Sequence, residues 1–307
     1  MRVVIAGSSG FLGTALRRTL DERGHETVRL VRREAGPGQS RWDPYAGTLD
    51  QSVVDSADVV VNLAGSPTAG NPHSKSWARE LEESRVTTTR VLAEAVARSH
   101  GSGHSPAYLA GNGISWYGDH GDQVLDEGAD SRGEAFLTRV SRVWQAATEP
   151  AAEAGARLCL LRTAPVLDRR SAPLKQLLPL FRLGLGARLG DGRQFFPIIS
   201  LRDWVGAVTH LVEGDGEGPH NLCCPITPTN GEFTEALARA VHRRAFLFAP
   251  APVLGVAAGR MSPELLGSVR AEPAALMRAG YDFADDDVRD VLATGLAEAP
   301  EDGPGPA

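Results

Sequence analysis

The sequence predicts an α/β fold in which a doubly wound parallel sheet is followed by a smaller C-terminal lobe. Short apolar runs alternate with amphipathic helical stretches through the first half of the chain, and three glycines at a spacing of three follow the first run. After Arg162 the pattern changes to shorter helices. Because consecutive parallel strands need a crossover connection, strands that alternate with helices indicate a parallel sheet.

The expected elements follow one another along the chain. In the first half, strands are expected at 2–6, 26–31, 58–63, 107–110 and 157–162, and helices at 12–23, 76–99 and 134–155. In the second half, helices are expected at 174–183, 201–213, 231–242 and 252–259, and strands at 195–199 and 219–224. Stretches rich in glycine and proline predict loops at 34–47, 66–73 and 100–106.

Two parts and a tail are expected. Residues 1–165 are assigned to the sheet domain, whose core strands can recruit later segments, and residues 166–297 to the lobe and its closing helices. Residues 298–307, rich in Glu, Pro and Gly, are expected to form a flexible tail. A chain of 307 residues is long enough to bury a large core.

Composition excludes several classes of function. Apolar residues make up 42% and charged residues 23% of the chain, and its net charge of −6 comes without a basic run, so no nucleic-acid partner is expected. No apolar stretch reaches the roughly 20 residues of a membrane span, and the first strand begins at residue 2. We therefore expect a cytoplasmic protein with no membrane partner. Cys159, Cys223 and Cys224 lie in apolar runs, so they are expected to be reduced thiols, and no metal site is predicted.

The glycine-rich turn carries the strongest functional signal. The run Gly7-Ser8-Ser9-Gly10-Phe11-Leu12-Gly13 joins a β-branched strand to a helix. There, backbone N–H groups and the positive helix end can hold a pyrophosphate. Gly7 permits the tight turn, Gly10 the close approach of phosphates, and Gly13 the packing of helix on strand. Ser9, Phe11 and Leu12 complete the expected cofactor contacts, although an ordinary βα turn would have a similar sequence.

The end of the second strand indicates which dinucleotide binds. NAD enzymes usually place an acidic residue there, on the ribose hydroxyls, whereas this chain has Arg32 and Arg33. Guanidinium groups bind a 2′-phosphate through charge-assisted hydrogen bonds, so NADP(H) is favoured over NAD(H), with Glu34 acting against this preference. Leu63, Ala64 and Gly65 end the next strand and leave room for a cofactor across the sheet.

Further motifs point to one family. They are Trp42-Asp43-Pro44, Ser84-Arg85-Val86, Tyr117-Gly118-Asp119, Leu161-Arg162-Thr163 and Gly190-Asp191-Gly192-Arg193-Gln194. With the glycine turn they resemble the atypical branch of the extended short-chain dehydrogenase/reductase superfamily known as epimerase family proteins. The resemblance implies a Rossmann doubly wound parallel sheet with a small C-terminal substrate lobe and a nicotinamide cofactor near Arg85, Thr163 and Pro165. It also implies a possible homodimer through the helices at 76–99 and 134–155.

The same resemblance exposes a departure in the catalytic machinery. The superfamily normally uses a Tyr-x-x-x-Lys pair for proton transfer, and alignment places Leu137 and Ser141 at those positions. The remaining candidates are Tyr117, as the proton donor, with Asn112 and Ser115. The alternatives are that Tyr117 only lines the pocket and that Asn112 only forms a turn.

Four lobe residues are expected to contact substrate. Arg182, Arg193 and Gln194 suit an anionic or sugar-like ligand, and Ser200 stands where relatives tend to have His. The sequence therefore predicts an NADP(H)-binding oxidoreductase or epimerase-like enzyme that acts on a small carbonyl, hydroxyl or sugar-like substrate without the usual pair. The alternative is a non-catalytic dinucleotide-binding sensor or regulatory protein.

Overall fold

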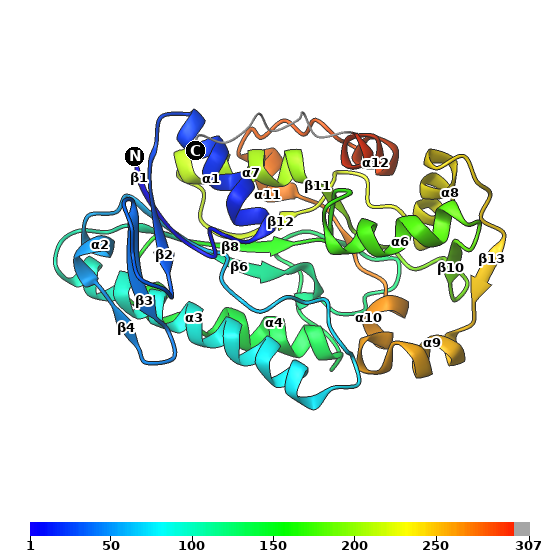
Figure 1. The fold of residues 1–307 in the computed structure, drawn as a ribbon, viewed down its shortest axis with the longest axis horizontal. Helices are drawn as coiled ribbons and strands as arrows, with labels where there is room; N and C mark the ends of the chain where they lie inside the picture. Colours follow the sequence, from blue (N-terminus) through cyan, green and yellow to red (C-terminus); the bar gives the residue numbers. More distant parts are fainter. Residues whose placement is uncertain (298–307) are drawn as a thin grey trace.

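The expected parallel strands lie in one eight-stranded sheet of the Rossmann type, in the order β12-β8-β6-β5-β1-β2-β3-β4 (Figure 1). The computed structural model describes residues 1–297. The sheet consists of β1 (Arg2–Ala6), β2 (Glu26–Val31), β3 (Gln39–Asp43), β4 (Thr48–Leu49), β5 (Val59–Asn62), β6 (Ala107–Gly113), β8 (Leu158–Thr163) and β12 (Gly218–Leu222). Among the described strands of this sheet, only the β3–β4 pair is antiparallel. The chain winds outward from β1 first to β2 and then to β5, so the strand order reverses beside β1.

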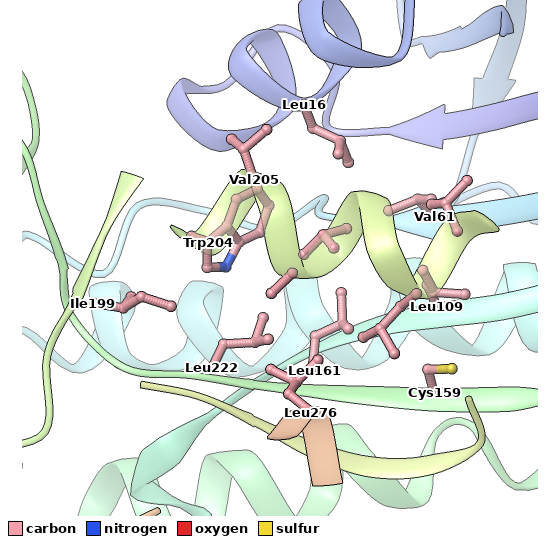
Figure 2. Packing of buried hydrophobic residues seen from close by; sticks show 14 of the residues in the cluster. Leu16, Val61, Leu109, Cys159, Leu161, Ile199, Trp204, Val205, Leu222 and Leu276 are labelled. Carbon is pink, nitrogen blue, oxygen red and sulfur yellow. The ribbon is translucent and has the colours of Figure 1, made fainter. Parts of the chain in front are cut away.

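Helices cover both faces of this sheet. One face packs against α1 (Phe11–Glu22) and α7 (Leu201–Glu213), and the other against α2 (Gln51–Asp55), α3 (Lys75–Gly101), α4 (Phe136–Ala146) and α5 (Glu149–Glu153). Side chains along β1 alternate between the two cores: Val3 and Ile5 lie on the α1 side, whereas Val4 and Ala6 lie on the α3 side. Figure 2 shows the first core, where Leu16 of α1 and Trp204 of α7 pack over the strands.

The lobe lies beyond the carboxyl ends of the strands and has a core of its own. Its helices are α6 (Ala172–Arg182), α8 (Asn230–Ala240), α9 (Ala251–Ala257), α10 (Ser262–Leu266) and α12 (Val288–Leu296). By contrast, α11 (Ala274–Arg278) packs on β12, and its Leu276 belongs to the core of the sheet. Three short parallel pairs accompany them: β9 (Val166–Leu167) with β11 (Ile199–Ser200), β10 (Ala187–Leu189) with β13 (Leu247–Ala249), and β7 (Val124–Leu125) with β14 (Arg270–Ala271). Leu174 and Phe181 of α6 pack with Phe233 and Leu237 of α8.

Several expected elements need correction. The stretch 34–47 is not only a loop, because it contains β3, whose buried Trp42 packs on the sheet. The helix expected at 134–155 is two helices, because Pro150 at the start of α5 lacks the N–H that a continuous helix needs. Of the strand expected at 195–199, only Ile199 belongs to one. The strand expected at 219–224 exists as β12 and extends the main sheet beside β8. The expected tail at 298–307 lies outside the described residues.

Candidate functional site

The glycine turn between β1 and α1 leaves no space for side chains. Gly7 has a φ of +79°, and a Cβ there would lie 2.5 Å from the carbonyl of Leu63. A Cβ on Gly13 would lie 2.2 Å from the carbonyl oxygen of Gly7. Gly10 is the N-cap of α1 and offers no side-chain acceptor, so the first N–H groups of this 12-residue helix are available to a ligand. The turn therefore has the geometry of an anion site.

A cavity of about 630 Å³ follows the carboxyl ends of the strands from this turn. Its lining brings together residues at or just after the ends of β1, β5, β6 and β8, which are far apart in the sequence. The expected site residues among them are Gly7, Gly10, Phe11, Leu12, Gly13, Leu63, Gly65, Arg85, Asn112, Ser115, Thr163 and Pro165. The space therefore crosses the sheet at the point where the strand order reverses, which is where parallel α/β sheets bind ligands.

Four of the expected cofactor residues stand outside the lining. Ser9 is exposed in the turn, and Ala64 uses its N–H to bind the side chain of Asn62 at 3.0 Å. Arg32 and Arg33 are exposed directly after β2, and no ion pair holds either of them within residues 1–297. Because β2 lies next to β1, both guanidinium groups belong to the same edge of the sheet as the glycine turn.

Arg85 gives the cavity a positive wall. Its guanidinium donates to the carbonyl oxygens of Ser66 and Leu81 and to Thr68 Oγ1, each at 3.0 Å, and lies 5.0 Å from the ring centre of Trp144. Burial lowers the pKa of Arg85 to about 10. No acidic residue is present in the lining of this described cavity, so the charge of Arg85 favours an anionic ligand there.

One face of α4 forms the adjoining wall, next to Arg85. Leu137, Val140, Ser141 and Trp144 all line the cavity. The helix therefore presents a leucine and a serine where alignment places the superfamily's tyrosine and lysine. Neither side chain can act as an acid near neutral pH, so this wall offers hydrogen bonding only through a serine hydroxyl.

Asn112, near the end of β6, contacts this wall, and Ser115 follows the same strand. The side chain of Asn112 is 3% exposed and already engaged, because its amide donates to the carbonyl of Ser141 at 3.3 Å and its oxygen accepts from Gly113 N at 2.7 Å. Ser115 is half-buried, and its hydroxyl has no hydrogen-bond partner within residues 1–297. Of the three expected catalytic residues, Ser115 is therefore the one with an unused polar group at the cavity.

Tyr117, the expected proton donor to substrate, lies in the core. Its side chain is fully buried and does not line the cavity. The hydroxyl accepts from Arg162 Nη1 at 2.9 Å and faces Asn221 Oδ1 at 2.8 Å. Burial raises the pKa of Tyr117 to about 12. The residue thus ties β8 and β12 together inside the core, which is a structural role.

The four expected substrate residues also stand away from the cavity. Gln194 donates to the carbonyls of Leu189 and Leu265, and Ser200 is fully buried as the N-cap of α7. Arg182 and Arg193 are exposed, and neither lines the cavity. The side chain of Gln194 therefore holds two backbone carbonyls of the lobe and that of Ser200 caps α7, and their contact with substrate stays a prediction.

Some residues that line the cavity were not predicted from the sequence. Trp144 lies at helical spacing from Leu137 and Ser141, so the period of the helix could have identified it. Arg170 and Pro173, at the start of α6, reach the cavity only because the lobe folds back over the sheet. Nothing local in the sequence marks them as part of a site.

The described part of the chain, residues 1–297, contains neither a metal-binding cluster nor a membrane-spanning helix. No group of three or more His, Cys, Asp or Glu side chains within residues 1–297 is placed to hold a metal ion. No helix in that part of the chain is long and apolar enough to cross a membrane. The three cysteines are buried and unpaired, and burial raises the pKa of Cys159 to about 11, so it is a poor nucleophile.

Comparison with known proteins gives two matching family models. The model described as the NAD dependent epimerase/dehydratase family matches residues 3–222, and a domain of unknown function matches residues 249–294. An epimerase family protein of Mycobacterium bovis is 39% identical over 293 residues, which cover 94% of this chain and 96% of that relative.

Solved structures agree with this assignment. The human epimerase family protein SDR39U1, crystallised with NADPH, has a TM-score of 0.83 and 31% identity, covering 95% of this chain and 98% of that one. A nucleoside-diphosphate sugar epimerase from Corynebacterium glutamicum has a TM-score of 0.76 and 33% identity, covering 96% of this chain and 58% of that one. The likeness extends over both the sheet and the lobe.

Proposed function

The chain belongs to the NAD dependent epimerase/dehydratase family, and on that basis we propose that it is an NADP(H)-dependent oxidoreductase of the extended short-chain dehydrogenase/reductase type. Its substrate is a small carbonyl or hydroxyl compound. The main support for the proposal is the cavity that runs from the glycine turn past Arg85 to Ser115 and has no Asp or Glu in its lining. A nicotinamide dinucleotide is an elongated anion. The cavity runs in the direction that such a ligand needs, and Arg85 gives it a complementary positive charge.

The residues present fit such a cofactor. The N–H groups at the start of α1 would hold the pyrophosphate, because Gly10 leaves them open and Gly13 lets the helix lie against the strand. Arg32 and Arg33 would bind a 2′-phosphate, which is why we favour NADP(H). Thr163 and Pro165, at the end of β8, would lie at the nicotinamide end.

The chemistry must proceed without a tyrosine acid. When bound, the cofactor supplies or accepts a hydride at the substrate carbon. The chain's part is to stabilise the charge that develops on the substrate oxygen, and the free hydroxyl of Ser115 can donate a hydrogen bond there. Leu137 and Val140 exclude water from the α4 side, and Arg85 favours an anionic group in the cavity. The proton itself comes from solvent, and loss of a positioned acid costs about 10²–10⁴ in rate.

The absence of a general acid from the cavity lining also favours a second function. Leu137 and Ser141 in the wall, with Tyr117 buried, are the arrangement expected of a protein that binds the dinucleotide without turnover and uses occupancy as a signal. The two functions differ in whether bound cofactor is consumed.

The test is oxidation of NADPH by a panel of aldehydes, ketones and nucleotide sugars that carry a keto group. We expect at least one class of compound to oxidise NADPH. Ser115→Ala should lower kcat about 10²-fold or more, because one hydrogen-bond donor to the developing charge is lost. Ser102→Ala, at an exposed serine after α3, is the matched control. Tight NADPH binding without oxidation by any member of the panel would instead support the sensor.

A further inference from the structure

Two segments of the lobe contain basic residues and no acidic ones. They are residues 169–190 and 239–263, which hold nine of the chain's 32 Lys and Arg residues and none of its 38 Asp and Glu residues. The rest of the chain is therefore strongly acidic, and the net charge of −6 conceals this separation. A charge asymmetry of this size produces a local positive potential that total charge does not reveal.

The fold brings these two segments together at one end of the molecule. β10, from the first segment, pairs in parallel with β13, from the second, so that Arg188 is the register partner of Phe248. Arg243 Nε donates to the carbonyl of Arg182 at 2.9 Å. Figure 1 shows α6, β10, β13 and α9 at the end of the molecule opposite α2 and β4.

Large apolar side chains protrude from the same region. Phe246 is 78% exposed, Leu183 74% and Val256 77%, and Phe248, Val253 and Leu185 are each more than half exposed. The arginines Arg182, Arg188, Arg243 and Arg244 are exposed beside them. We call these ten residues the lobe tip. Exposed apolar clusters of this kind on a protein surface mark interaction sites.

Charge and shape select the occupant. A second copy of the chain, joined by a two-fold axis, would place the four arginines of one lobe tip against those of the other, which is repulsive. A bilayer with acidic headgroups complements the arginines and accepts protruding apolar side chains without a matching groove. We propose that the lobe tip docks on the surface of an anionic lipid bilayer, with Phe246 and Phe248 inserted at the headgroup boundary.

This proposal revises the expectation that the chain has no membrane partner, which rested on total charge and on the search for a spanning segment. Surface docking needs neither a spanning helix nor a positive net charge, only a local cluster of arginines and apolar side chains. It does not depend on the chemistry at the cavity, because the lobe tip lies at the opposite end of α6 from Pro173.

The test is flotation of the full-length protein with two kinds of vesicle, one of phosphatidylcholine alone and one of phosphatidylcholine and phosphatidylserine in equal parts. We expect binding to the second kind only, weakening between about 0.1 M and 0.5 M salt because ions screen the arginines. Phe246→Ser with Phe248→Ser should weaken binding at least about tenfold. Arg243→Glu with Arg244→Glu should weaken it at least about 25-fold.

Matched variants elsewhere separate docking from general effects. Arg79→Glu with Arg90→Glu removes two exposed arginines from α3, and Ile226→Ser removes an apolar side chain that is 62% exposed outside the lobe tip. Both should bind vesicles like the wild type, and all variants should keep the wild-type melting temperature and NADPH affinity.

Three results would overturn the proposal. The first is equal affinity for both kinds of vesicle, or none for either. The second is binding that the lobe-tip variants leave unchanged. The third is a concentration-dependent dimer in sedimentation that Phe246→Ser with Phe248→Ser abolishes, because the occupant would then be a second copy.

Discussion

The glycine turn provides a graded test of the cofactor site. Gly10 is the N-cap of α1 and Gly13 lies in its first turn. The two positions differ in the atoms that an added methyl group would contact. At Gly13 the methyl would lie 2.2 Å from Gly7 O and 2.8 Å from Ser8 Cα, both backbone atoms that cannot yield without moving the turn. At Gly10 its nearest neighbour would be Gly7 O at 3.3 Å, which a small shift relieves.

These distances predict two different kinds of loss. Gly13→Ala should lower the free energy of unfolding by about 1–3 kcal/mol, as overpacking does, and should also distort the turn. Gly10→Ala should leave stability nearly unchanged, because its φ of −73° suits any residue. Its methyl would nevertheless stand between the N–H groups and the phosphates, so NADPH should bind at least about tenfold more weakly, a loss of ~1.4 kcal/mol.

The assay is NADPH fluorescence titration alongside chemical unfolding of the same preparations. Gly101→Ala is the control, because a methyl at the end of α3 would meet nothing within 4 Å. If Gly10→Ala bound NADPH like the wild type, the phosphates would not lie against this turn, and the reasoning would fail. Wild-type stability of Gly13→Ala would show that the contact with Gly7 is not as tight as described.

Three further predictions concern charge and burial. Arg32→Asp should weaken NADPH binding about 10²-fold more than NADH binding, because it replaces a partner of the 2′-phosphate with a repelling carboxylate, and equal losses in the two titrations would contradict that role. Tyr117→Phe should cost about 1–3 kcal/mol of unfolding free energy in a denaturant titration, because Arg162 and Asn221 lose a buried partner, whereas a loss of turnover at unchanged stability would restore Tyr117 as an acid. Burial lowers the pKa of His220, so the unfolded chain binds the proton more readily, and the free energy of unfolding should fall as the pH drops below about 6.5. His220→Gln should flatten this dependence, and an unchanged slope would assign the effect to other groups.

Much of the sheet could be predicted from the sequence because its signals are local. A buried β-branched run such as Val3–Ala6 needs no partner to be recognised, and the glycines after it dictate the turn. β3 escaped prediction because Gln39–Asp43 carries only two buried side chains among polar ones. The break between α4 and α5 depends on Pro150, which is a local signal that the amphipathic pattern outweighed.

The site was predictable where it is built from strand ends, and not where it depends on packing between distant segments. Asn112, Ser115 and Thr163 follow strands of one parallel sheet, so they meet at one edge. Tyr117 also follows such a strand, but the 3-10 turn at Ile114–Trp116 sends it into the core, where Arg162 and Asn221 bind it. The partners of Tyr117 lie 45 and 104 residues away, so no local pattern reveals its burial.

The most direct test of the cofactor site is a titration of the wild-type protein with NADPH and with NADH, in which binding is measured by nicotinamide fluorescence and by calorimetry. We expect saturation at one NADPH per chain and weaker binding of NADH, because the glycine turn would hold the pyrophosphate and Arg32 and Arg33 would hold the 2′-phosphate. If neither nucleotide bound, the cavity at the strand ends would not be a dinucleotide site. If both bound equally, the arginines after β2 would have no part in cofactor choice.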